Sequence, residues 1–280
     1  MEPVAFGLTL IDLAVVGGVA LVLPSCLGGG WRWWALVAGS VAVACSLERG
    51  HVAAVLLALV WPVAVVAVGG PTVVRVLRGE PSGGRRVVPV LTVGYALVAA
   101  GALVVSRAGW APFGFHEPII QLTAVHFTFA GPAALVLAST AAASARTTAT
   151  RRLGTAAIVL TAGAPPVVAL GFFTHAALAQ VGGAVLMSLG VFATAALHLE
   201  RAVRGGAPSG TRLLLAVSGL AVWVPMVLAV AWAAAEHADV PALSIPDMVR
   251  THGMGNAVGF VGAGLLAGHL QERRGAGSWS

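Results

Sequence analysis

The sequence predicts an all-α integral membrane protein, a polytopic bundle of about nine transmembrane helices. Of its 280 residues, 58% are hydrophobic and only 9% are charged, whereas an ordinary soluble domain is about 25% charged. A soluble fold of this length could not hide so much apolar surface, so most of the solvent must be lipid. Apolar stretches long enough to cross a bilayer recur along the whole chain. We expect residues 1–280 to form a single integral membrane domain.

The expected spans follow one another with short polar turns between them. The first is interpreted as a retained span and not as a signal peptide, because Glu2 stands where a basic region would lie and Asp12 interrupts the apolar run. The second is the shortest. Prolines such as Pro62 and Pro132 do not exclude a span, because neighbouring helices can satisfy the freed backbone groups. The spans cover residues 4–23, 31–47, 52–70, 87–106, 118–141, 153–173, 176–198, 212–234 and 248–270.

The arginines orient this bundle. With nine spans and the N-terminus outside, the turns after spans three, five and seven lie on the same side as the C-terminal tail. The positive-inside rule makes that side cytoplasmic, whereas the turn after span eight is acidic. The arginines of the four segments are Arg75, Arg78, Arg85, Arg86, Arg146, Arg151, Arg152, Arg201, Arg204, Arg212, Arg273 and Arg274. We therefore expect a multi-pass protein of the cell membrane.

Several other classes of protein are not supported. The net charge of +6 comes from arginines in short turns, without the basic domain or aromatic interleaving of a nucleic-acid-binding protein. Cys26 and Cys45 have no metal-ligand spacing and are expected to pack as small apolar residues. No nucleotide-binding motif is present, and we expect no metal or cofactor. The tryptophans Trp31, Trp33 and Trp34 are expected to anchor the membrane interface.

Polar residues inside the fifth span are its most informative feature. The stretch HEPIIQLTAVHFTFAGP (116–132) places Glu117 at the outer mouth of the span, with Gln121 one turn deeper on the same face. His126 lies nine residues beyond Glu117, about 13 Å deeper, and faces another way. Because ionisable residues in a span are expensive, they indicate a functional site.

The first and ninth spans carry polar residues at a similar depth. Asp12 lies about 12 Å inside the outer end of span one, where a lone carboxylate needs a partner or a proton. His252 and Asn256 share one face of span nine, one turn apart. We therefore expect these residues to converge with those of span five in a polar pocket in the outer half of the bundle.

Structural roles are the alternative for the same residues. His126 could be a neutral core histidine that bonds across helices, and Asn256 could join two helices. Glu117 could lie in the headgroup region, since Pro118 suits the first turn of a helix.

Two segments resemble the YndJ-like integral membrane proteins of bacteria. They are LTAVHFTFAG (122–131) and THGMGNAVGF (251–260). The resemblance implies that Glu117, His126, His252 and Asn256 belong to one site, but it supplies no reaction. Thr128 stands where related segments often have a second histidine, which puts any metal site of the family in doubt here. A looser resemblance, of architecture alone, is to small membrane-bound terpenoid cyclases.

The first functional hypothesis is an enzyme that acts on a lipophilic, isoprenoid-type substrate by acid-initiated terpenoid cyclisation. Glu117 or Asp12 would donate a proton, and His126 would orient the acid or accept the final proton. Aromatic faces would stabilise the travelling cation. The residues expected to contact substrate are Gln121, His252, Asn256, Phe127, Phe260 and Trp232.

Two further hypotheses use the same residues. A membrane transporter or binding protein would use them to relay protons or to hold a lipophilic ligand. A metal or haem protein would need His126 and His252 to meet across helices, because no HxxH pair occurs within a span. Membrane lipid and a lipophilic small molecule are the expected partners.

Overall fold

The structure is a computed structural model that describes residues 8–80, 86–238 and 240–277, with the backbone alone for residues 272–277. It is built of helices, as the composition predicts. The chain divides into two compact units, Met1–Ala133 and Ala134–Ser280, and each is described by itself.

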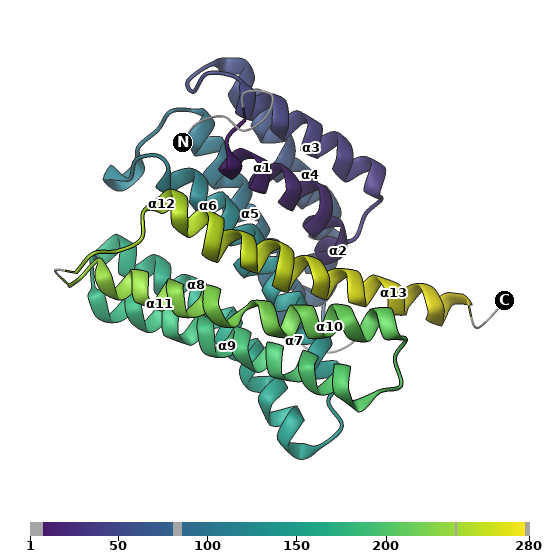
Figure 1. Cartoon of the computed structure of the whole chain (residues 1–280). Coiled ribbons are helices and arrows are strands. Elements are labelled where there is room, and N and C mark those ends of the chain that lie inside the picture. Colours follow the sequence, from purple (N-terminus) through teal and green to yellow (C-terminus); the bar gives the residue numbers. More distant parts are fainter. Residues whose placement is uncertain (1–7, 81–85, 239, 278–280) are drawn as a thin grey trace. The chain divides into compact units, whose positions relative to one another are not determined.

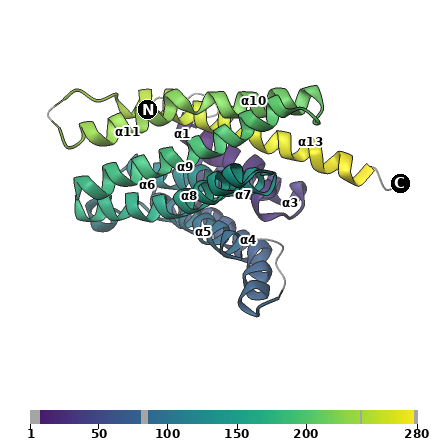
Figure 2. The same cartoon turned by 90° about the horizontal axis from the view of Figure 1, so that it is seen from below.

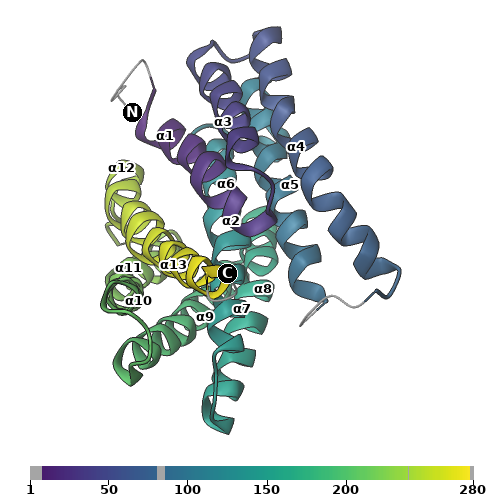
Figure 3. The ribbon, with the colours of Figure 1, turned by 90° about the vertical axis from the view of Figure 1, so that its right-hand side faces the viewer.

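The first unit is a bundle of membrane-type helices. Figure 3 shows α4 packed beside both α3 and α5. The first helix runs from α1 through a π-helical segment into α2, and the last one continues from α6 into a second π-helical segment. The elements are α1 (Leu10–Gly17), η1 (Gly18–Val22), α2 (Leu23–Leu27), α3 (Trp31–Ser46), α4 (Val52–Leu77), α5 (Val87–Arg107), η2 (Pro112–Gly114), α6 (Ile119–Thr128) and η3 (Phe129–Ala133).

The core of the first unit is apolar and holds two tryptophans. Trp34 and Trp61 are fully buried, together with Leu103 of α5. The indole N–H of Trp34 donates to the carbonyl of Gly28 at 2.8 Å. The expectation that Trp34 anchors the interface is therefore wrong, because its side chain is rotated by about 100° from that of the exposed Trp33 and faces the core.

The second unit is arranged around the long hairpin of α8 and α9, which lie side by side in Figure 1. Figure 2 shows α10 and α13 packed beside each other. The elements are α7 (Ala134–Ala143), α8 (Thr148–Thr174), α9 (Ala177–Arg204), α10 (Ser209–Ala221), α11 (Trp223–Ala235), α12 (Ile245–Met248), η4 (Val249–Gly253), η5 (Gly255–Gly262) and α13 (Ala263–Gly277).

Local sequence explains where these helices begin and where they widen. Thr147 caps α8, and its hydroxyl accepts a hydrogen bond from the backbone N–H of Thr150 at 3.1 Å. The π-helical segment η3 contains Pro132, which has no N–H to continue the α-helical ladder. Segments η4 and η5 coincide with the polar opening of the predicted ninth span. Single π-helical turns often occur at functional sites.

Seven helices of the described chain are long and apolar enough to cross a membrane. They coincide with seven of the expected spans. The other two expected spans are helical but are not among these seven: α3 has only 16 residues, about 24 Å against a hydrocarbon core of about 30 Å. The helix from Ile245 to Gly277 carries His252, Asn256 and His269, which lower its hydropathy.

Apolar side chains on the outer faces of the helices agree with a lipid solvent. Leu56, Val63 and Val66 of α4 are 61%, 64% and 56% exposed. Monomeric soluble proteins rarely expose large continuous apolar surfaces. The chain is therefore an all-α membrane protein.

The arginine pattern predicts that reporter fusions at residues 82, 148, 206 and 276 all lie in the cytoplasm. A fusion at the N-terminus is expected outside if α3 crosses the membrane, because the span count before the first arginine-bearing turn is then odd. Enzymatic reporters that are active on only one side of the membrane would measure this. One external signal among the four positions would contradict the orientation, and a cytoplasmic N-terminus would show that α3 does not cross.

Candidate active site in the first unit

A network of polar side chains joins the start of α1 to the start of α6. The Asp12–Glu117 cluster, as we name it, consists of Thr9, Asp12, Arg49, Glu117 and Gln121. Asp12 is the third residue of α1, and its carboxylate closes a capping box with Thr9. It accepts from the Thr9 backbone N–H at 2.8 Å and from the Thr9 hydroxyl at 2.6 Å.

Gln121 is the third donor to Asp12. Its amide N–H donates to the second carboxylate oxygen of Asp12, across 109 positions of sequence. Both side chains are buried, with Asp12 5% and Gln121 3% exposed. Most buried polar groups in proteins are hydrogen-bonded, and Asp12 follows this rule with three donors. This carboxylate is therefore engaged on both oxygens.

Glu117 has a different environment. One carboxylate oxygen, Oε2, accepts from the backbone N–H of Gln121 at 3.2 Å. The other, Oε1, is buried and has no hydrogen-bond partner. It lies 3.9 Å from Nε of Arg49, in a loose ion pair whose arginine side chain is 46% exposed. Glu117 thus offers one carboxylate oxygen that is held in place but not hydrogen-bonded.

His126 and Phe127 lie on α6, which begins two residues after Glu117. The His126 Nδ1 bonds to the carbonyl of Leu122 at 2.9 Å. Because a carbonyl can only accept, Nδ1 carries the hydrogen, and this bond stays within the helix. Phe127 meets Tyr95 edge to face, with ring centroids 5.7 Å apart. Gln121 donates to the carboxylate of Asp12, and the expected role of His126 in orienting an acid stays a prediction.

Arg107 and Cys45 lie near the cluster and were not identified from the sequence as neighbours of the site. Arg107 is 3% exposed and donates to the Cys45 carbonyl at 3.2 Å and to the Ser106 hydroxyl at 2.9 Å. Its Nε is buried without a partner. The Cys45 thiol lies within electrostatic range of Asp12, Arg107 and Arg49. The sequence does contain one indication of Arg49 and Arg107. Both lie on the predicted outer side, where the positive-inside rule expects few arginines.

The second unit contains the other expected polar residues. The Nδ1 of His252 donates to the carbonyl of Pro225 at 2.8 Å, so it cannot also accept from the Asn256 amide 3.3 Å away. The Asn256 N–H group instead lies 3.5 Å from the sulfur of Met226, and its Oδ1 is buried without a partner. Within the second unit, these contacts join η4 and η5 to α11.

The two aromatic residues expected in the second unit have structural partners there. Trp232 donates its indole N–H to the carbonyl of Leu243 at 3.0 Å. Phe260 is 2% exposed, and its ring centroid is 6.2 Å from that of His198. Of the expected site residues, the first unit thus contains Asp12, Glu117, Gln121, His126 and Phe127. A common pocket with His252, Asn256, Phe260 and Trp232 stays a prediction.

The Asp12–Glu117 cluster brings together groups that can take up or release a proton. It combines an engaged carboxylate, a second carboxylate with a bare oxygen and a positioning amide. Within the described residues, no group of three His, Cys, Asp or Glu side chains could hold a metal ion.

Comparison with known proteins bears out the resemblance seen in two segments. The model of the YndJ-like protein family matches residues 18–260. This match includes Glu117, His126, His252 and Asn256. No curated protein and no solved structure matches the chain. Because the family model covers most of its length, the chain belongs to the YndJ-like family.

Proposed function

We propose that this protein is an enzyme of the cell membrane that cyclises a lipophilic, isoprenoid-type substrate, with Glu117 as the proton donor. The observation that carries the proposal is the buried Oε1 of Glu117, which has no hydrogen-bond partner. A general acid needs an oxygen from which a proton can reach the substrate. Asp12 offers none, since three donors already engage its carboxylate.

The proposed reaction is a redox-neutral isomerisation. Glu117 transfers a proton to the oxygen of a prenyl epoxide, and the carbon–oxygen bond breaks to leave a carbocation and a hydroxyl group. The electrons of a nearby alkene then form a new carbon–carbon bond to the cation. Loss of a proton from the last cation to a base forms an alkene. Atoms and electrons balance without a cofactor.

The length of the site favours an elongated substrate. Glu117 lies two residues before α6 and Phe127 lies near the other end of that helix, so the helical part alone separates them by about 12 Å at about 1.5 Å per residue. Phe127 and Tyr95 together offer aromatic surface, which stabilises a cation over a ring face. An elongated apolar molecule has the length to reach from the carboxyl group to these rings, and a prenylated molecule has that shape.

One observation favours a second candidate, a transporter or binding protein for a lipophilic ligand or for protons. Glu117 lies beside Arg49, and a carboxylate that stays paired with a guanidinium suits ligand binding or proton relay better than acid catalysis. The two candidates differ in one requirement, since only the enzyme must convert its ligand.

We expect membrane fractions that contain the protein to convert at least one prenylated epoxide into a cyclic product of unchanged mass. The reason is that proton-initiated cyclisation rearranges bonds without adding or removing atoms. Liquid chromatography with mass spectrometry measures the conversion, and membranes from the same host without the protein are the control. If no prenylated epoxide or alkene is converted, the cyclase proposal fails and the binding candidate takes its place.

A further inference from the structure

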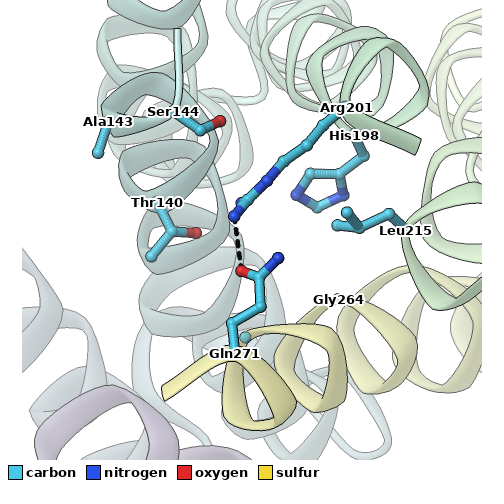
Figure 4. A pocket seen from close by; sticks show the side chains of 9 residues that line it. Thr140, Ala143, Ser144, His198, Arg201, Leu215, Gly264 and Gln271 are labelled. Atoms are coloured by element: carbon cyan, nitrogen blue, oxygen red, sulfur yellow. Dashed lines mark hydrogen bonds between the residues drawn. The ribbon is translucent and has the colours of Figure 1, made fainter. Parts of the chain in front are cut away.

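The second unit contains a cavity of about 360 Å³ that the proposed cyclisation does not use. It lies between α7, α9, α10 and α13, and its polar lining residues are Thr140, Ser144, His198, Arg201 and Gln271. Figure 4 shows the guanidinium of Arg201 reaching across the cavity between the two hydroxyl residues and the His198 ring. Its volume is within the range of small-molecule sites, about 300–1,000 Å³.

Arg201 provides the positive charge of this cavity. Its Nη2 donates to the Gln271 side-chain carbonyl at 2.6 Å, which fixes the guanidinium. Among the described residues it has no carboxylate partner, and none of the residues that line the cavity is acidic. A guanidinium has five N–H donors in a planar fork that matches phosphate and carboxylate groups. The other donors are therefore available to an anion.

The hydrogen bonds of His198 determine which ring nitrogen carries a hydrogen. The Ser218 hydroxyl donates to the carbonyl of Phe260 at 2.8 Å, so its only hydrogen is used. The contact of 3.0 Å between Ser218 Oγ and His198 Nδ1 must then have Nδ1 as the donor. In the neutral ring, Nε2 consequently has a lone pair and accepts hydrogen bonds.

The two hydroxyl groups in the lining are also acceptors. Thr140 donates its hydrogen to the carbonyl of Leu137 at 3.0 Å, and Ser144 donates to that of Ala141 at 2.7 Å. Their oxygens retain lone pairs for a ligand. The cavity therefore combines a cationic donor with several neutral acceptors, which suits an anion that still carries a hydrogen.

We propose that this cavity binds a phosphate group that retains one proton, with its anionic oxygens on Arg201 and its P–OH donating to Nε2 of His198. The same chemistry occurs in inorganic phosphate and in a phosphate monoester such as the headgroup of phosphatidic acid. Sulfate has a similar shape and charge but no proton at neutral pH. The site is therefore expected to discriminate between phosphate and sulfate, which a purely electrostatic site would not.

The test uses the full-length protein in phosphatidylcholine nanodiscs. Inorganic phosphate is titrated by calorimetry, with sulfate titrated in parallel, and the lipid source is tested as a rise in melting temperature when phosphatidic acid is added to the nanodisc. We expect phosphate to bind, or phosphatidic acid to stabilise the protein. Sulfate is expected to bind at least ~10-fold more weakly than phosphate, because it has no proton to donate in a hydrogen bond to His198. Absence of both phosphate responses would overturn the proposal, as would equal binding of sulfate.

Two variants on α9 locate the site. Arg201→Gln is expected to weaken the phosphate response at least ~10-fold, because it removes a charged hydrogen-bond donor. Arg204→Gln is the matched control, since Arg204 lies three residues further along and pairs with Glu200 outside the cavity lining. It should keep the wild-type response. An unchanged response in Arg201→Gln, or equal losses in both variants, would contradict the assignment.

Discussion

Replacing Glu117 with glutamine is expected to lower turnover of a prenylated epoxide by at least ~100-fold, the low end for general acid catalysis. Glutamine keeps the size of the side chain and can still accept from the Gln121 backbone N–H, but it has no acidic proton. The structure gives the Glu117 carboxylate only that hydrogen bond and a loose contact with Arg49. We therefore expect kcat to fall and the melting temperature in detergent to stay close to that of the wild type.

Asp12→Asn is the comparison variant. It should reduce stability more than Glu117→Gln does and reduce turnover less. The Asp12 carboxylate accepts three hydrogen bonds, from the Thr9 backbone, the Thr9 hydroxyl and Gln121. Asparagine turns one acceptor oxygen into a donor, so at least one buried donor loses its partner, at a cost of about 1–3 kcal/mol. Asp12→Asn should therefore lower the melting temperature clearly, and it should lower kcat by less than Glu117→Gln does. Glu117→Asp keeps an acid and should retain more activity than Glu117→Gln. Full activity in Glu117→Gln would remove Glu117 as the acid.

Replacing Gly183 with valine is expected to destabilise the second unit by about 3 kcal/mol or more, the upper part of the range for overpacking. A Cβ atom at Gly183 would lie 2.7 Å from the backbone nitrogen of Val168 and 2.6 Å from its Cγ2. The backbone of α8 cannot yield at that distance without separating the two helices. Small residues allow such close approach between membrane helices.

The neighbouring glycine is a matched control for that substitution. Gly182 lies on the same helix, and a Cβ atom there would meet nothing within 4 Å. Gly182→Val should therefore melt close to the wild type, whereas Gly183→Val should melt well below it. Thermal unfolding in detergent, followed by the loss of the folded peak in size-exclusion chromatography, measures both. Equal melting temperatures would show that the α8–α9 contact does not depend on this glycine.

The sequence predicted most of the helices because hydropathy is a local property. A window of about twenty residues is sufficient to recognise a span, whatever it packs against. The prediction was weakest at α3, where the length of the helix is marginal, and at the helix from Ile245 to Gly277, where polar side chains reduce the hydropathy. It was wrong for Trp34, because hydropathy does not reveal which side of a helix faces the core.

The candidate site was predicted only in part. Glu117 and Gln121 were expected on one face because they are one turn apart, and the structure has the Gln121 backbone N–H bonded to Glu117. The bond from Gln121 to Asp12 joins residues 109 positions apart, and no spacing rule could indicate it. Arg107 and Cys45 were not identified for the same reason, since their contact crosses 62 positions.

By itself, the sequence determined that the protein lies in lipid, that it is helical and where most spans lie. These properties follow from the composition and from the hydropathy summed over short windows of the chain. Tertiary structure decided which polar groups meet. The rotation of each helix selects the side chains that face its neighbours, and glycines such as Gly183 set how closely two helices approach. Those choices leave Asp12 engaged and one oxygen of Glu117 bare. They also place Arg201 and His198 in the lining of one cavity. Neither result follows from the local sequence, because each depends on the packing of several helices at once.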